Sequence, residues 1–243
     1  ALSSAASDVY KRQEHAMALA SGIAKNDGKP FYGVYSSFLQ RTYDQLSQDV
    51  CINKSPVTIA VFAASVYGMS DVTHLGIYDI PMISNIPELV YLAPVTKEEY
   101  LAMLDWSLEQ NEHPVAIRVP ASLVSDGKSF TKDLSKLDKY EITQQGSQVA
   151  VIALGSFYGL GVEAAKLIEE KTGVKATVIN PYYITGIDKE MLESLKADHK
   201  TVITLEDGVL EGGFGEKIAR FYGDSNVKTL CFGLEKKFYD RYD

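Results

Sequence analysis

Residues 34–45 read VYSSFLQRTYDQ, in which a short apolar strand ends at two serines and continues into a helical segment with an aromatic residue, an arginine and an aspartate. In a parallel α/β sheet, the junction between a strand and the following helix lies at the carboxyl edge of the strands. Ligands bind at that edge, where helix N–H groups and side chains are available to them. We therefore expect Phe38 and Arg41 to face a ligand.

Strand and helix patterns alternate on both sides of this junction. In the first half, strands are expected at 31–35, 57–62, 90–92 and 115–119, and helices at 16–23, 39–52 and 97–110, the last with Thr96 as its N-cap. In the second half, strands are expected at 149–154, 176–179, 201–205 and 227–232, and helices at 159–171, 189–197 and 215–222. Such alternation predicts parallel strands with crossover helices, and hence an α/β fold with two parallel-sheet domains.

The expected domain boundaries follow from composition. Residues 1–12 are Ser-rich and without periodicity, so we treat them as a non-native leader and exclude them from the fold. Residues 122–140 are rich in Ser, Asp, Lys and Gly and are the predicted linker. The two domains are then 13–121 and 141–243, both within the usual size range.

Composition excludes several classes of function. The chain has 243 residues with 24 Lys and Arg against 32 Asp and Glu, a net charge of -8, which makes nucleic acid an unexpected partner. No run of about 18 apolar residues and no signal-peptide pattern is present, so we expect a cytoplasmic protein that does not span a membrane. Cys51 and Cys231 lack metal-type spacing, and we interpret both as buried thiols of a reducing compartment.

The segment YSSFLQRTYDQL at 35–46 resembles the pyrimidine-binding domain of the 1-deoxy-D-xylulose-5-phosphate synthases, thiamin-diphosphate-dependent enzymes of the transketolase superfamily. The resemblance extends with gaps from Glu14 to Asp243. It implies a transketolase-like pyrimidine-binding domain followed by a transketolase C-terminal domain, assembled as a homodimer. It also implies that Phe38 stacks on the pyrimidine of thiamin diphosphate, with Tyr35 and Arg41 as neighbours in the cofactor pocket. As an alternative, a lone Phe is more often a core residue.

The same resemblance implies a glutamate that shares a proton with the pyrimidine ring of the cofactor, nine residues before a helical glycine. Counting back from Gly22 reaches Gln13, and Glu14 lies one position later. Glu14 is a catalytic candidate, and its alternative role is a charge favoured by the helix dipole. If Gln13 is native, its amide cannot share a proton as a carboxylate does, and activity should fall steeply.

Residues 68–74, GMSDVTH, resemble a family loop of the form Gly-x-Asp-Gly-x-Thr-His, which implies that His74 meets substrate oxygens. An imidazole can move a proton near neutral pH. The alternative is a surface histidine in a Gly-rich loop. Ser70 stands where the family has an aspartate, with Asp71 displaced by one, and a family arginine is missing near Ala63.

A second family arginine corresponds to Arg118, which the resemblance implies as a ligand of a substrate phosphate. We expect Asp79, by contrast, to be a solvated or capping residue. The glycines around Glu206-Asp207-Gly208 and at 212–215 we interpret as turn and close-packing positions rather than a phosphate cradle.

The superfamily holds the diphosphate and Mg²⁺ through a separate N-terminal domain that begins with Gly-Asp-Gly, and this tripeptide does not occur in the chain. We therefore expect no metal site here and no activity from this chain alone. The intact enzyme would condense pyruvate with a sugar phosphate, glyceraldehyde 3-phosphate, for isoprenoid and thiamin biosynthesis. We prefer a fragment of a longer gene. The alternatives are the C-terminal subunit of a split transketolase and a non-catalytic α/β interaction module.

Overall fold

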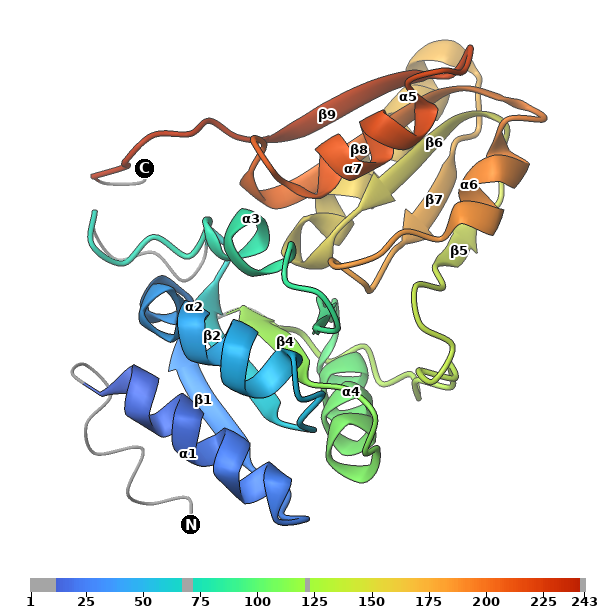
Figure 1. Ribbon diagram of the computed structural model, residues 1–243. Coiled ribbons are helices and arrows are strands. Elements are labelled where there is room, and N and C mark those ends of the chain that lie inside the picture. The colour runs from blue at the N-terminus through green and yellow to red at the C-terminus, as the bar shows by residue number, and fades with distance from the viewer. Residues whose placement is uncertain (1–11, 67–71, 121–122, 241–243) are drawn as a thin grey trace.

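The computed structural model describes residues 12–66, 72–120 and 123–240, which form two α/β layers joined through a short helix (Figure 1). The first sheet has four parallel strands in the order β1-β2-β4-β3, where β1 is Phe31–Tyr35, β2 Thr58–Ala64, β3 Val90–Leu92 and β4 Val115–Pro120. The main helices packed on it are α1 (Gln13–Lys25) and α4 (Lys97–Glu109). These strands lie within two residues of the predicted ones because each is a buried apolar run.

The helix predicted at 39–52 is irregular. A 3₁₀ helix, η2, covers Ser36–Thr42, a short α-helix, α2, covers Tyr43–Gln45, and a π-helix, η3, covers Leu46–Cys51. The buried Thr42 hydroxyl donates to the Leu39 carbonyl at 2.8 Å, a local bond that competes with a regular α-helical turn. The strand β1 is therefore followed directly by a 3₁₀ helix and not by a regular α-helix.

The second sheet has five strands in the order β5-β7-β6-β8-β9. The strands are β5 (Glu141–Gln144), β6 (Gln148–Ala153), β7 (Thr177–Asn180), β8 (His199–Val209) and β9 (Lys228–Leu234), and the helices are η5 (Gly155–Phe157), α5 (Tyr158–Thr172), α6 (Lys189–Leu195) and α7 (Phe214–Tyr222). Four strands are parallel as predicted. The edge strand β5 is antiparallel to β7 and was not predicted, because its sequence contains a single apolar residue, Ile142.

Backbone hydrogen bonds connect the two sheets. Leu92, at the end of β3, forms an antiparallel bridge with Tyr183. On either side of it, Ala93 N donates to Tyr182 O at 2.7 Å and Ile184 N donates to Tyr91 O at 2.8 Å. Buried side chains of both layers form one continuous hydrophobic core. The two layers are therefore fixed to one another at this point.

The segment between the layers is partly buried. Leu134 and Tyr140 lie in the core although residues 123–140 contain no helix. A further short helix, α3 (Asp79–Ile83), was not predicted and packs against β8 of the second sheet. Cys51 is buried as predicted, whereas Cys231 is only half-buried because it lies on the edge strand β9. No helix in the described part of the chain is long and apolar enough to cross a membrane.

Candidate functional site

Three of the predicted site residues meet at the carboxyl edge of the first sheet. Tyr35 ends β1, Phe38 follows in η2, and His74 comes from the segment after β2. The Phe38 ring is perpendicular to the ring of Tyr35, with centroids 5.9 Å apart, and lies edge-on to His74 at 5.3 Å. Tyr35 is 47% exposed and Phe38 is half-buried, so one side of this aromatic group faces outward.

A neighbouring threonine orients the imidazole. The hydroxyl of Thr73 lies 2.7 Å from Nδ1 of His74. A hydrogen bond at one ring nitrogen selects the tautomer and determines the direction of the other nitrogen. Thr73 therefore positions His74, a role that sequence reasoning did not assign, although Thr-His as adjacent residues was the available signal.

Gln13 and Glu14 begin α1, which runs antiparallel to β1 because a short turn connects the end of the helix to the start of the strand. The first residue of α1 is therefore at the carboxyl edge of the sheet, near η2, against which the helix packs. Gln13 is buried, whereas Glu14 is exposed. Burial, reinforced by the charge of Glu14, raises the pKa of Tyr32. Gln13 thus occupies the inward position, and the catalytic role of Glu14 stays a prediction.

Arg41 lies three residues after Phe38 in η2. Residues three apart eclipse in a 3₁₀ helix, so both are on the same side of it. Arg41 is exposed. Between η2 and residues 72–82 lies a cavity of about 320 Å³, lined in part by Ser36, Ser37 and Thr73. The buried Ser36 hydroxyl, which lines this cavity, has no hydrogen-bond partner among the described residues. A polar ligand group in the cavity would supply one.

Arg118 is 2% exposed and belongs to an ion network between the domains. Its guanidinium donates to Asp79 of α3 at 2.7 and 3.1 Å and to Asp207 of β8. Tyr91 also donates to Asp79. Burial alone would lower the pKa of Arg118, but Asp207 and Asp79 raise it well above its usual value. The phosphate-binding role of Arg118 stays a prediction, and a phosphate would have to displace one of these carboxylates.

The prediction that Asp79 is solvated or capping is wrong. Asp79 is 1% exposed because its partner Arg118, 39 residues away in sequence, is buried opposite it. Next to Asp207, the Glu206 carboxylate accepts hydrogen bonds at 2.8 Å from the backbone N–H groups of Phe214 and Gly215. Burial raises the pKa of Glu206 to about 7, and these two N–H groups oppose the shift. The adjacent residues Glu206 and Asp207 thus connect the N-terminus of α7 to the ion network of Arg118.

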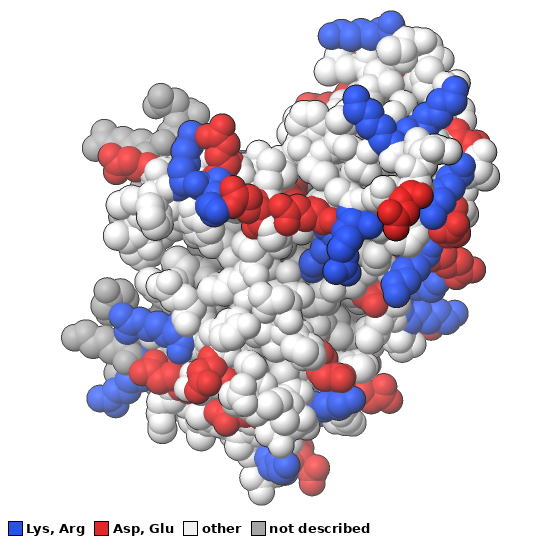
Figure 2. Space-filling model, turned by 45° about the horizontal axis from the view of Figure 1, so that its top comes forward, with Lys and Arg blue, Asp and Glu red and all other residues white. Residues whose placement is uncertain are grey.

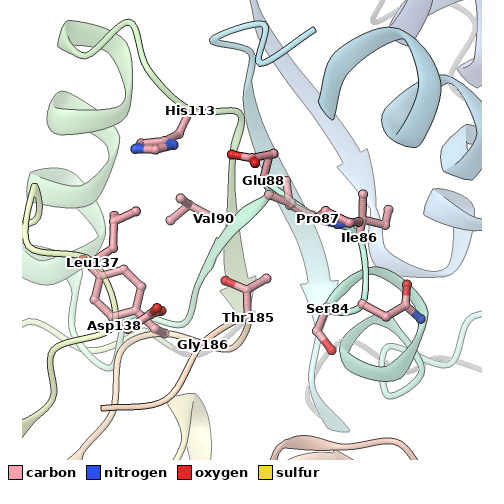
Figure 3. Close-up of a pocket in the computed structure, with 13 residues that line it drawn as sticks. Ser84, Ile86, Pro87, Glu88, Val90, His113, Leu137, Asp138, Thr185 and Gly186 are labelled. Atoms are coloured by element: carbon pink, nitrogen blue, oxygen red, sulfur yellow. The ribbon is translucent and has the colours of Figure 1, made fainter. Parts of the chain in front are cut away.

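A third region combines polar groups at the opposite, amino edge of the first sheet. A cavity of about 360 Å³ opens where β3 and β4 begin (Figure 3). Figure 3 shows His113 and Glu88 on one side of it and Asp138 and Thr185 on the other. The Thr185 hydroxyl accepts a hydrogen bond from Tyr91 N at 3.2 Å. This cavity therefore lies at the opposite ends of the strands from the Phe38–His74 group.

The surface charges do not gather into one basic region on the face that Figure 2 shows. Lys and Arg lie beside Asp and Glu in a row that crosses this face and along its edges, and the surface below the row is mostly uncharged. Among the described residues, no group of three or more His, Cys, Asp and Glu side chains could hold a metal ion. The polar groups around Phe38 include the hydroxyls of Ser36 and Thr73, the imidazole of His74 and the guanidinium of Arg41.

Comparison with known proteins identifies the family. The family profile described as the transketolase pyrimidine-binding domain matches residues 8–126, and that of the transketolase C-terminal domain matches residues 138–235. This chain belongs to the transketolase family. The α/β fold with two mostly parallel sheets, predicted from the alternation of strands and helices, is confirmed.

Relatives of this transketolase-family chain include 1-deoxy-D-xylulose-5-phosphate synthases. The chain is 38% identical over 231 residues to the one from Clostridium perfringens (strain ATCC 13124), and 35% identical over 233 residues to the one from Clostridium tetani. These matches cover 93% and 95% of this chain but 37% of each relative. A solved structure of a split gene transketolase, described as an inactive beta4 tetramer, superposes with a TM-score of 0.82 over 95% of this chain and 75% of its own, at 24% identity.

The transketolase family implies thiamin diphosphate as cofactor. The residues at the carboxyl edge fit binding of its pyrimidine ring but do not fit proton transfer to that ring. The half-buried Phe38 ring, edge-on to Tyr35 and His74, suits an aromatic heterocycle. The buried Gln13 amide can make a hydrogen bond to a ring nitrogen but cannot exchange a proton with it. The donor set therefore fits binding of the pyrimidine and does not fit a carboxylate proton relay. Ser70 and Asp71 lie outside the described residues.

Proposed function

We propose that this chain forms the pyrimidine-binding and C-terminal domains of a thiamin-diphosphate-dependent transferase that condenses pyruvate with glyceraldehyde 3-phosphate to 1-deoxy-D-xylulose 5-phosphate. The observation that carries the proposal is the placement of Phe38 between Tyr35 and His74 at the carboxyl edge of the first sheet. Supporting it is the similarity to named synthases over 93% of the chain.

Thiamin diphosphate, when bound, supplies the carbanion chemistry. Phe38 and Tyr35 would hold the pyrimidine, with Arg41 at the rim of the pocket. His74, oriented by Thr73, would donate a hydrogen bond to a substrate oxygen or move a proton there. Gln13 would hold the ring without transferring its proton.

The diphosphate and Mg²⁺ would be held by a further domain, in the same polypeptide or in a separate subunit, in a cytoplasmic homodimer. The relatives support the presence of a further domain, because this chain spans 37% of their length. A second candidate is the C-terminal subunit of a split transketolase, which the similarity in fold to a split gene transketolase favours. A non-catalytic interaction module is the third, and Gln13, Ala63 and Ser70, each at a position where the family has a charged residue, favour it.

A chimera tests the proposal. The matching region of the Clostridium perfringens synthase is replaced by this chain, with Gln13 or with Gln13→Glu, and product formation from pyruvate and glyceraldehyde 3-phosphate is measured. We expect Gln13→Glu to raise the rate by about 100-fold or more, the usual contribution of a positioned acid–base group. A Phe38→Ala chimera should lose binding of thiamin diphosphate in calorimetry. A chimera that binds no cofactor with either residue at position 13 would instead identify an interaction module.

A further inference from the structure

A further cavity, of about 480 Å³, lies where strands of both sheets end. Its wall includes Val95 and Thr96, which follow β3, Tyr158, which follows β6, and Asn180, the last residue of β7. We name it the β3–β7 cavity. Ligands of α/β proteins bind outside the carboxyl ends of strands, and cavities of this volume hold small molecules.

The β3–β7 cavity is separate from the Phe38–His74 group. Phe38 follows β1, which is one edge of the first sheet, and Val95 follows β3, which is the other edge. Two strands lie between β1 and β3, so the two sites are roughly 14 Å apart along the sheet at about 4.8 Å per strand.

Asn180 leaves a buried acceptor in this cavity. The residue is 2% exposed, and its amide nitrogen donates to Glu99 Oε1 at 3.3 Å. Its side-chain oxygen has no hydrogen-bond partner among the described residues. The amide nitrogen thus faces the carboxyl group of Glu99, and the amide oxygen is the atom without a partner in the described part of the chain. An unsatisfied buried acceptor is costly, and a ligand hydroxyl would satisfy it.

Three carboxylates, of Glu99, Asp126 and Glu141, and two lysines, Lys128 and Lys132, complete the polar wall. Glu99 accepts from Val95 N at 2.7 Å, while Glu141 accepts from Lys132 Nζ at 3.0 Å and from the hydroxyl of Tyr182. Burial raises the pKa of Glu99 to about 7, opposed by the N–H groups of Val95 and its neighbour and reinforced by Glu141. The wall thus offers both acceptors and donors of hydrogen bonds, with charges of both signs.

Aromatic rings form the remaining surface. Phe130 lies edge-on to Tyr182, with ring centroids 5.4 Å apart, and Tyr158 donates to the Thr143 hydroxyl at 2.8 Å. Tyr182 has a φ of +56°, in the left-handed region that costs a non-Gly residue energy. Its carbonyl accepts the interdomain bond from Ala93 N at 2.7 Å, so this conformation is held by the junction of the sheets.

We propose that the β3–β7 cavity binds a small neutral polyhydroxylated molecule, a sugar or polyol, whose hydroxyls donate to Asn180 and Glu99 and whose C–H face packs on Phe130. The cavity is lined by the carboxylates of Glu99, Asp126 and Glu141 and by the ammonium groups of Lys128 and Lys132, so a strongly charged ligand of either sign would meet like charges there. Hydroxyls match both the acceptors and the donors of this wall.

The test is calorimetry and ligand-observed NMR on the full chain with xylose, glucose, xylitol and inositol, and with glycerol phosphate and 1,4-diaminobutane as comparison probes. We expect saturable binding of at least one neutral compound and of neither charged probe. Asn180→Leu and Phe130→Leu should each weaken that binding by about tenfold, the effect of losing one hydrogen bond or one packing contact. Glu88→Gln, in the cavity of Figure 3, should leave it unchanged.

Thermal unfolding of each variant identifies any that do not fold, and the half-buried Phe130 provides a variant that spares the core if Asn180→Leu unfolds. The proposal is overturned if no neutral compound binds the folded native chain, or if only a charged probe binds. Equal affinity in the native chain and in both folded cavity variants would also overturn it.

Discussion

Replacing Arg118 with methionine removes the cation of the buried network between the domains. The Arg118 side chain is 3% exposed, and those of Asp79 and Asp207 are 0% and 1% exposed. In the variant, Tyr91 is the remaining donor to Asp79 among the described residues. Removing one member of a buried ion pair costs about 3–5 kcal/mol, because an uncompensated charge stays buried. That is a large part of the roughly 5–15 kcal/mol that stabilises a typical domain.

Urea unfolding followed by circular dichroism and by fluorescence of Trp106, the single tryptophan, measures this loss. The matched control is Lys54→Met, which breaks the ion pair to Glu88 at 3.1 Å with side chains 58% and 43% exposed, and should cost less than about 1 kcal/mol. Adding Asp79→Asn and Asp207→Asn to Arg118→Met should recover most of the loss, since the cost comes from unpaired charge. An Arg118→Met variant within about 1 kcal/mol of the native chain would refute this account.

Three further perturbations have expected outcomes. Burial raises the pKa of Glu206 from 4.5 to about 7, so between these pH values the folded chain binds a proton that the unfolded chain releases. The free energy of unfolding should therefore fall as pH rises through this interval, by up to about 3 kcal/mol in total. Glu206→Gln should remove this pH-dependent loss in urea titrations. Gly76→Ala should destabilise the chain by about 1–3 kcal/mol, because the added Cβ would lie 2.0 Å from the Ala63 carbonyl oxygen. Gly22→Ala in α1, whose added Cβ would meet nothing within 4 Å, should instead stabilise the chain by roughly 0.5–1 kcal/mol. Equal shifts of the melting temperature in the two variants would contradict this. Ser36→Ala should leave the stability of the free chain within about 1 kcal/mol of native or raise it, and a larger loss in thermal unfolding would show that the hydroxyl has a partner in solution.

Local sequence patterns were sufficient for the central strands. Runs such as β2 and β6 are apolar after their first residue because helices cover both faces of a parallel sheet. The polar edge strand β5 gave no such signal. The short helix α3 was also missed, since its placement depends on contacts with β8. Buried central elements are therefore encoded locally, and edges and junctions are not.

The candidate site divides in the same way. Phe38 and His74 could be found because each lies in a compact motif, and the structure brings them within 5.3 Å. Asp79 was misassigned because its burial depends on Arg118, which is distant in sequence. The pair Glu99 and Asn180 was missed, although the spacing from Thr96 to Glu99 marks a helix start and Thr96 does cap α4. No local pattern brings Asn180 to the same place.

The backbone bridge between Leu92 and Tyr183 has a consequence for limited proteolysis. A protease that cuts the exposed stretch around residues 125–129 severs the covalent connection between the layers, but it leaves the bridge, the ion network of Arg118 and the shared core intact. The two halves should then migrate together on a native gel and separate only in denaturant. Two independently expressed halves are expected to find one another by the same contacts, so the chain can be divided at its connector without losing its shape.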